Sequence, residues 1–386
     1  MGPANKGIFF NLAKSISSRL RYNNKISNNS SFPGSRFIPR RLQHVYANRD
    51  EKLLLRRRRL DGNTNTNEGK NVSYFSILGT DNNGSHFSLE KNYCLANHRF
   101  DMQSMRSRIV GSCNGIICLN DDYQLGNIVL WNPLTDELKY LPPTSIDLPA
   151  KAPYILFGHS VFGFDPRSDD YKVLRFVENG MLSNYRTENH FEVYSLKNDS
   201  WKQIINPVKF RYPCRDPLEI SSFTLNGSCY WETDNRILCF DFADEVFSYL
   251  PLPPIQEKSQ IEEDIERCLV GIDGSTLGLI VRPHRSERNF CLWVWESKEW
   301  CWSKVDSFKV RDGVRVLLGL FGGDKCFFGG WLNELMLFDL TTRELKTLDI
   351  EDHFPWATSL VPFVESTVSI KGHSNERIND LWSNRD

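Results

Sequence analysis

A glycine-flanked cysteine in the first third of the chain has the form of a reactive nucleophile. Gly111-Ser112-Cys113-Asn114-Gly115 has the G-x-C-x-G spacing of a nucleophile elbow, in which a sharp strand-to-helix turn exposes the attacking group. An elbow needs a helix directly after the turn, but Ile116-Ile117-Cys118-Leu119 is an apolar, β-branched run that is typical of a strand. The pattern therefore favours a tight hairpin turn, and we predict no catalytic role for Cys113.

Other residues that carry chemistry lack the spacing that their chemistry needs. The eight histidines show no H-E-x-x-H or His-x-His pattern, and the ten cysteines include no C-x-x-C pair that could hold one zinc ion. The glycine-rich stretch 319–330 lacks the Gly-Lys-Ser/Thr ending of a phosphate loop. Asp121-Asp122 and Asp169-Asp170 lie in polar segments, where Asp caps its own backbone in turns. We expect no cofactor, no metal, no enzymatic activity, and cysteines that are free thiols.

The elements that would position a functional residue repeat along the chain. Five segments share an apolar strand that ends in a large aromatic residue, a polar turn, and a second strand. The aromatic residues, spaced by 63, 46, 55 and 43 residues, are Trp131, Tyr194, Phe240, Trp295 and Phe338. Such intervals match one four-stranded blade per repeat, as in kelch-type propellers of about 50 residues. The pattern predicts an all-β, propeller-like fold.

A sixth blade is expected from the two ends of the chain. Strand-like runs at 52–58, 72–78 and 86–89 precede the first repeat, and two more at 357–364 and 367–370 follow the last. Strands from both ends would close the ring and cover sheet edges that otherwise invite aggregation.

The N-terminal segment differs in charge from the rest of the chain. Residues 1–49 contain nine Lys and Arg residues and no acid, although the whole chain of 386 residues has a formal net charge of -1. Phe9, Leu12, Ile16 and Leu20 recur at helical spacing, which is the amphipathic composition of a transit peptide for a mitochondrion or plastid. A disordered tail and a nucleic-acid-binding arm are the alternatives. We expect no nucleic-acid partner, and no membrane span, because no apolar run approaches about 18 residues.

Several short motifs, taken in order, resemble the plant F-box-associated interaction domain, most closely its S-locus F-box-like branch. They are Ile109-Val110-Gly111-Ser112-Cys113-Asn114-Gly115-Ile116-Ile117-Cys118, Leu130-Trp131-Asn132-Pro133-Leu134-Thr135, Phe162-Gly163-Phe164-Asp165, Asp169-Asp170-Tyr171-Lys172-Val173-Leu174 and Ile237-Leu238-Cys239-Phe240-Asp241. The resemblance divides the chain into a basic arm at 1–36, an F-box-associated propeller-like domain at 37–371, and a tail at 372–386. No F-box pattern is recognised, and the basic arm occupies its place.

The resemblance implies a substrate receptor of an SCF-type ubiquitin ligase, which recruits a target protein for ubiquitination. Its further partners would be the Skp adaptor and a cullin, and its location the cytoplasm or nucleus. Two alternatives stay open. One is an F-box-less relative that binds a protein without recruiting a ligase, and the other is a propeller enzyme with carboxylates converging on the central axis. A fluorescent reporter fused to residues 1–40 distinguishes an organelle from the cytoplasm or nucleus.

Propellers recognise partners with loops at one rim, which the blades hold rigidly. Candidate rim segments are 142–153, 179–189, 211–217, 256–266 and 283–288. Within them lie five residues of the types that are enriched at binding hot spots, namely Tyr185, Arg186, Arg211, Tyr212 and Arg215. We predict that these five residues bind the partner.

Overall fold

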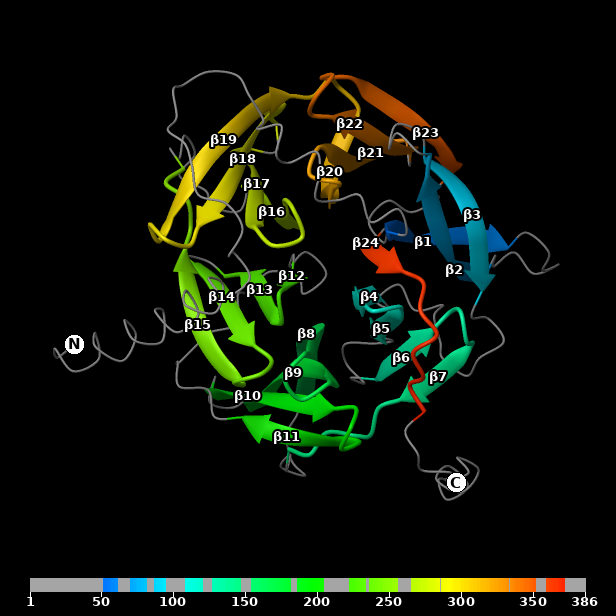
Figure 1. Cartoon of the computed structure of the whole chain (residues 1–386), viewed down its shortest axis with the longest axis vertical. Coiled ribbons are helices and arrows are strands. Elements are labelled where there is room, and N and C mark those ends of the chain that lie inside the picture. Colours follow the sequence, from blue (N-terminus) through cyan, green and yellow to red (C-terminus); the bar gives the residue numbers. More distant parts are fainter. Residues whose placement is uncertain are drawn as a thin grey trace, which may run out of the picture.

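The computed structural model describes residues 51–61, 70–81, 87–94, 108–120, 127–146, 154–181, 186–204, 222–233, 236–255, 265–284, 286–332, 334–351 and 359–371. These residues form six four-stranded antiparallel sheets around a central axis (Figure 1). No helix occurs among them. The predicted all-β propeller is confirmed, and so is its sixth blade.

The blades follow one another along the chain, and the first strand given for each is the innermost. Blade 1 comprises β24 (Ser359–Val364), β1 (Glu51–Asp61), β2 (Lys70–Thr80) and β3 (Phe87–Cys94). Blade 2 comprises β4 (Arg108–Cys113), β5 (Ile116–Asn120), β6 (Ile128–Asn132) and β7 (Glu137–Tyr140). Blade 3 comprises β8 (Tyr154–Asp165), β9 (Asp170–Met181), β10 (Arg186–Ser195) and β11 (Ser200–Ile204).

The other three blades have the same order. Blade 4 comprises β12 (Ser222–Leu225), β13 (Ser228–Glu232), β14 (Arg236–Asp241) and β15 (Val246–Pro251). Blade 5 comprises β16 (Glu266–Gly271), β17 (Leu277–Arg282), β18 (Asn289–Glu296) and β19 (Cys301–Lys309). Blade 6 comprises β20 (Val314–Phe321), β21 (Lys325–Gly330), β22 (Glu334–Asp339) and β23 (Leu345–Glu351).

The core consists of six apolar clusters, one in each seam between adjacent blades. Successive side chains of a strand point to opposite faces, so each blade contributes to two seams. Leu53 and Leu55 pack against blade 6, whereas Leu54 between them packs against blade 2. Each repeated aromatic residue faces the preceding blade, as Trp131 does towards Phe75 of blade 1. Strands with two buried faces therefore read as continuous apolar runs.

One turn geometry closes the outer hairpin of blades 2 to 6. Each repeated aromatic residue pairs across the hairpin with the residue seven positions later, for example Tyr194 with Trp201. The residue five positions after each aromatic has a positive φ; these residues are Asp136, Asp199, Glu245, Trp300 and Arg343. Side chains at the start of the turn accept backbone N–H bonds, as Asp241 does from Ala243 at 2.9 Å.

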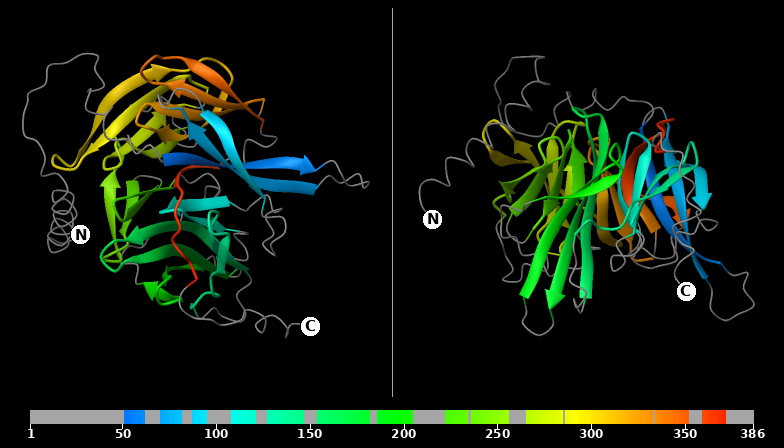
Figure 2. Two further views of the ribbon diagram at one scale, coloured as in Figure 1. Left: turned by 45° about the vertical axis from the view of Figure 1, so that its right-hand side comes forward. Right: turned by 90° about the horizontal axis from the view of Figure 1, so that it is seen from below.

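Strand alternation gives the ring two different rims. The turns between the first and second strands and between the third and fourth strands of a blade lie at one rim, which we call the short-turn rim. The turns between the second and third strands, and the connections between blades, lie at the other, which we call the long-connection rim. β8 and β9 have 12 residues each and β10 has 10, and these strands and the β1–β2 hairpin extend far towards the long-connection rim (Figure 2, right).

The ring closes through β24, which pairs with β1, and through the segment that follows it. Glu365 lies 3.2 Å from Lys52 and 2.6 Å from Lys91, so it joins two strands of blade 1. Residues 365–371 then cross to blade 2, visible as the red segment in Figure 1. There the buried Asn132 amide donates to the carbonyls of Ser366 and Val368, and Ile370 is fully buried. The strand expected at 367–370 is therefore wrong, and these residues form a strap across blade 2.

Lys172 joins blades 3 and 4 near the short-turn rim. Its Nζ lies 3.2 Å from Asp165 and 3.0 Å from Glu245, and it donates to the carbonyl of Phe242 at 2.8 Å. Burial alone would raise the pKa of Glu245, but hydrogen bonds from Lys202 and Lys172 outweigh it and hold that pKa below its usual value. Ion pairs therefore hold the seam between blades 3 and 4 near the short-turn rim, and apolar contacts hold the rest of it.

Gly115→Ala tests the contact between the strap and blade 2. Gly115 has φ +81°, and an added Cβ would lie 2.5 Å from Cβ of Ser366 and 2.8 Å from its backbone nitrogen. Gly322 has a similar φ of +61°, with 3.7 Å to the nearest atom, so Gly322→Ala measures backbone strain alone. We expect Gly322→Ala to lower the free energy of unfolding in urea by about 1 kcal/mol and Gly115→Ala by about 1 to 2 kcal/mol more. Equal losses would contradict the close approach of the strap.

Lys172→Met should destabilise the fold most at neutral pH. A carboxyl group with a depressed folded pKa stabilises the fold above its unfolded pKa, and that contribution is lost as the pH falls through the folded value. The variant leaves Asp165 and Glu245 without their buried cation, so we expect a loss of about 3 kcal/mol at pH 7 that shrinks as both carboxyls protonate below about pH 4. Urea unfolding at pH 7, 5 and 3 measures it. Lys202→Met, which removes a largely exposed partner of Glu245, is the control and should cost under about 1 kcal/mol. If the free energy of unfolding fell by the same amount at every pH, the ion pairs of Lys172 with Asp165 and Glu245 would not be the source of the stability.

Candidate protein-binding rim

The long-connection rim is the place where the structure concentrates candidate binding residues. All five predicted rim segments join strand ends at this rim, because they connect β7 to β8, β9 to β10, β11 to β12, β15 to β16 and β17 to β18. Antiparallel pairing of the flanking strands determines this placement, as Arg186 of β10 opposite Met181 of β9 shows. The topology thus brings the five segments to one side of the ring.

The five predicted binding residues belong to the segments that join the strands at this rim. Tyr185, Arg211, Tyr212 and Arg215 lie outside the described residues, and only the backbone of Arg186 is described. Arg186 begins β10 at the long-connection rim. The assignment of these five residues to the interface stays a prediction.

An exposed apolar tip, missed by the sequence analysis, lies at the same rim. Trp331 is 66% exposed and Leu332 is 87% exposed, in the turn between β21 and β22. The Arg315 guanidinium lies 5.5 Å from the centre of the Trp331 ring. Trp and Arg are the residue types that dominate binding energy at protein interfaces. The signal in the sequence was the adjacent Trp331-Leu332 pair, directly after Gly329-Gly330 and between two strand-like runs.

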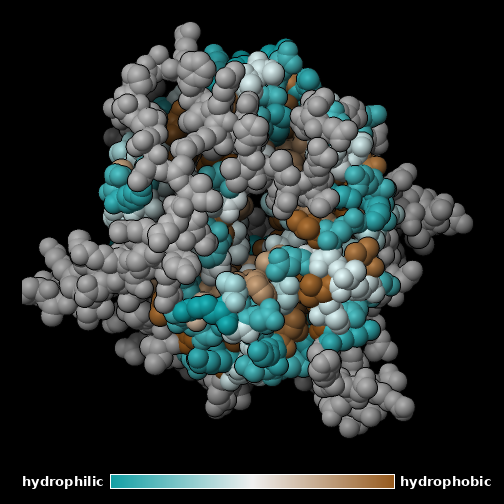
Figure 3. Space-filling view, viewed as in Figure 1, coloured by the Kyte–Doolittle hydropathy of each residue, from teal (hydrophilic) through white to brown (hydrophobic). Residues whose placement is uncertain are grey.

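The apolar surface on the face seen in Figure 3 is scattered. In its part not drawn in grey, hydrophobic residues form small separate patches between hydrophilic ones (Figure 3). Of the residues in the short turns, Leu134 is 43% exposed and Trp300 is 37% exposed. Scattered exposure of this size is ordinary for a protein surface.

A polar network seals the seam between blades 2 and 3 at the long-connection rim. Glu192 of β10, fully buried, accepts a hydrogen bond from Arg175 Nε at 2.9 Å and from Thr144 Oγ1 at 3.0 Å. Ser145 donates to the same carboxylate through its backbone nitrogen at 3.2 Å. The segment that follows β7 is thereby fixed onto blade 3.

Trp201 completes this seal. Its indole Nε1 donates to the carbonyl of Pro142 at 2.7 Å, and the Arg175 guanidinium lies 4.2 Å above its ring. Ile146, four residues after Pro142, is buried. The residues at this seam therefore support the rim rather than bind a ligand.

The nucleophile-like motif is a hairpin turn, as the sequence indicated. Asn114 and Gly115 have φ values of 49° and 81° between β4 and β5, and no helix follows. Burial raises the pKa of the Cys113 thiol to about 11, so the thiol is protonated at neutral pH. No group of three or more His, Cys, Asp or Glu residues that could hold a metal ion occurs in the described ranges.

The innermost strands do not provide the carboxylate pair that a propeller enzyme requires. As far as the structure describes them, they carry two acids, Asp165 at the end of β8 and Glu266 at the start of β16. These lie at opposite rims, and each is paired with a cation, Lys172 or Arg282. Glu266 also accepts a hydrogen bond from the Leu317 backbone nitrogen at 2.7 Å. Both acids hold strands together.

The geometry defines a class of protein, a six-bladed β-propeller with a short-turn rim and a long-connection rim. The family model of the F-box associated beta propeller domain matches residues 68–370. The chain therefore belongs to the F-box associated β-propeller family, and the resemblance drawn from its motifs is confirmed.

Two curated relatives come from Arabidopsis thaliana. F-box protein CPR1 is 27% identical over 277 residues, which is 64% of this chain and 64% of the relative. A putative F-box/kelch-repeat protein is 31% identical over 184 residues, which is 45% of this chain and 44% of the relative. The chain thus spans less than two thirds of the length of either relative. Among solved structures, a periplasmic gluconolactonase of Pseudomonas aeruginosa is similar at a TM-score of 0.41 with 12% identity, over 81% of this chain and 85% of that one.

Within the described ranges, no helix is long and apolar enough to cross a membrane.

Substitution of Glu192 tests whether the sealed seam supports the rim. Glu192→Ala leaves the buried Arg175 charge without its acid, so we expect the free energy of unfolding to fall by about 3 to 5 kcal/mol in urea denaturation. The double variant Arg175→Met/Glu192→Leu removes both charges and should recover most of that loss. Glu287→Ala, at the same rim but outside this network, is the control and should change stability by less than about 0.5 kcal/mol. A single-variant loss below about 1 kcal/mol would show that the network does not hold the seam.

Proposed function

We propose that the chain is a substrate-recognition subunit of an SCF-type ubiquitin ligase and grips its target protein with the long-connection rim. Two findings support this proposal. The chain belongs to the F-box associated β-propeller family, and its relatives carry the name F-box protein. The observation that carries it is the exposed Trp331–Leu332 tip beside Arg315, at the rim where the connections between blades gather.

A receptor of this kind binds and does not catalyse. Its target would be a protein surface, since exposed aromatic and Arg side chains suit flat protein interfaces better than small-molecule sites. The Skp adaptor and a cullin are the other proposed partners. The compartment that this function implies is the cytoplasm or nucleus.

A second candidate is a relative that binds a protein partner without joining a ligase. One observation favours it: residues 1–49, where the family would have its F-box, contain no acid and no Trp. The two candidates share the same binding rim and differ only in adaptor recruitment.

Affinity purification of the tagged full chain, with quantitative mass spectrometry, tests both. We expect a target protein together with the Skp adaptor and cullin, and Trp331→Ala should lower target recovery by tenfold or more, equivalent to a loss of about 1.4 kcal/mol or more. Leu134→Ala, an exposed apolar residue at the short-turn rim, is the matched control and should leave recovery unchanged. A target without adaptor and cullin supports the second candidate. Equal target recovery by the wild type and Trp331→Ala would exclude the tip from the interface.

A further inference from the structure

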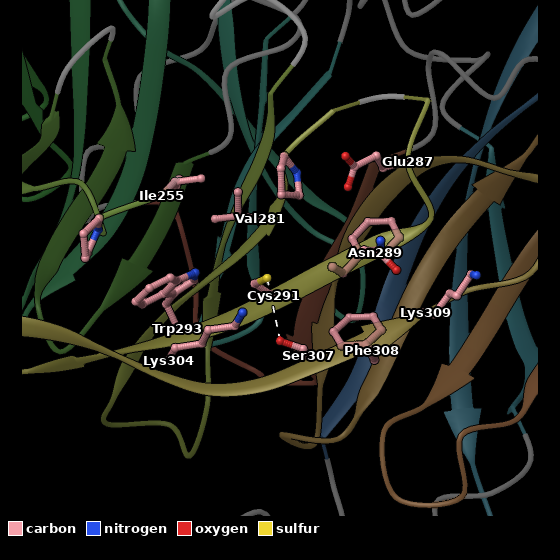
Figure 4. Close-up of a pocket in the computed structure, with 13 residues that line it drawn as sticks. Ile255, Val281, Glu287, Asn289, Cys291, Trp293, Lys304, Ser307, Phe308 and Lys309 are labelled. Carbon is pink, nitrogen blue, oxygen red and sulfur yellow. Dashed lines mark hydrogen bonds between the residues drawn. The ribbon is translucent and has the colours of Figure 1, made fainter. Parts of the chain in front are cut away.

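The seam between blades 4 and 5 is open at the long-connection rim. A cavity of about 660 Å³ lies there, walled by β17, β18 and β19 of blade 5 and by Pro254 and Ile255 after β15 (Figure 4). Its long wall consists of three alternate cross-strand pairs of β18 and β19, and these are Asn289 with Lys309, Cys291 with Ser307, and Trp293 with Lys304. Figure 4 shows the three pairs in a row along the hollow. We call this cavity the blade 4/5 groove.

Comparison with the sealed seam between blades 2 and 3 explains why this one is open. Trp302 donates its indole N–H to the carbonyl of Pro251 at 2.7 Å, just as Trp201 donates to Pro142. The two seams can therefore be aligned residue by residue. Two positions before the repeated aromatic, Trp293 occupies the place of Glu192.

The same alignment places Pro253 and Pro254 at the positions of Thr144 and Ser145. Prolines have no N–H or hydroxyl to donate, and an indole has no acceptor for such bonds. The bonds that fix residues 144–146 over blade 3 thus have no counterpart over blade 5. The Trp293 Nε1 is also left without a hydrogen-bond partner.

The charged side chains that line the groove are mainly positive. Lys304 and Lys309 are exposed at opposite ends of the outer wall, and neither side chain forms an ion pair or hydrogen bond within the part of the chain that the structure describes. Glu287 is the one acid among the lining residues that the structure describes. The two lysines are opposite Trp293 and Asn289, four residues apart on β18, which corresponds to about 14 Å along an extended strand. Between them, Val281 and Cys291 form an apolar floor (Figure 4).

We propose that the blade 4/5 groove binds an extended acidic segment of the partner protein. Residues i, i+2 and i+4 of an extended chain point to the same side. Acidic residues at i and i+4 would meet the two lysines, and a small apolar residue at i+2 would contact the floor beside Cys291. The inference rests on the proposed function, because it names the chemistry by which the same rim recognises its target.

A displayed library of random 12-residue peptides, selected on the purified full chain, tests the proposal. We expect enriched peptides with two acids four positions apart, and we expect Lys304→Glu/Lys309→Glu to weaken their binding by at least about tenfold. Lys298→Glu, an exposed lysine of the same blade in the β18–β19 turn at the short-turn rim, is the matched control and should bind like the wild type. All three substituted lysines are exposed, so the variants should keep the wild-type midpoint of thermal unfolding, which is measured alongside.

Several outcomes would overturn the inference. They are the absence of enrichment, enrichment of basic or uncharged peptides, and equal binding to the double variant. Residues 256–264 follow Ile255 and contain four acids, Glu257, Glu262, Glu263 and Asp264. If replacing all four with Ser tightened peptide binding tenfold, the groove would belong to the chain's own segment and not to a partner.

Different results would contradict the groove proposal and the proposed function. If Lys304→Glu/Lys309→Glu recovered the target at the wild-type level, the target would not bind through the groove, and the proposed function would stand. Recovery of no target by the wild type, together with acidic peptides that bind the groove, would contradict the proposed function alone.

Discussion

Burial of both faces of every blade is the constraint on which this structure depends. A four-stranded sheet that is apolar on both sides, such as blade 1 with Leu53 and Leu55 on one face and Leu54 on the other, cannot be stable alone in water. Each face needs a neighbour, and a row of blades would always leave two faces uncovered. Only a closed ring covers them all. β24 and the strap at 365–371 provide that closure, because they tie the end of the chain to blades 1 and 2.

The fold could be predicted because its repeat has a local signature. The aromatic residue, the polar turn and the residue seven positions later lie in one hairpin, so they are read together in the sequence. Blade 1 lacks this signature: Leu78 of β2 faces the preceding blade where the other blades have an aromatic residue. Its existence followed only from strand-like runs left over at both ends. The strand predicted at 367–370 was wrong because alternating burial of Val368 and Ile370 occurs equally in a strap packed on one side.

The rim could be predicted, but its binding chemistry could not. Chain order alone brings every connection between blades to one side of the ring, so the predicted rim segments needed no side-chain information. The blade 4/5 groove depends instead on residues about 40 positions apart that line the same cavity, such as Pro254 and Trp293, and no local sequence pattern indicates that they lie together. In the sequence, Trp293 reads as one more core residue of an apolar strand. Its difference from Glu192 becomes informative only when the two seams are aligned through Trp201 and Trp302.

The two rims differ in how strongly their local geometry restricts the sequence. At the short-turn rim, residues with positive φ and buried side-chain bonds such as those of Asp241 leave little freedom, because most substitutions there strain a turn or break a cap. At the long-connection rim the first residues of a connection still pack on the seam, as Ile146 and Ile255 do. Loop sequences in general tolerate change more readily than the strands that they join. The sealed and open seams differ at a few positions, with Trp293 in place of Glu192 and Pro253 and Pro254 in place of Thr144 and Ser145. In such a ring, new specificity can therefore arise at the ends of the seams as well as in the loops, while the apolar clusters that hold the blades stay the same.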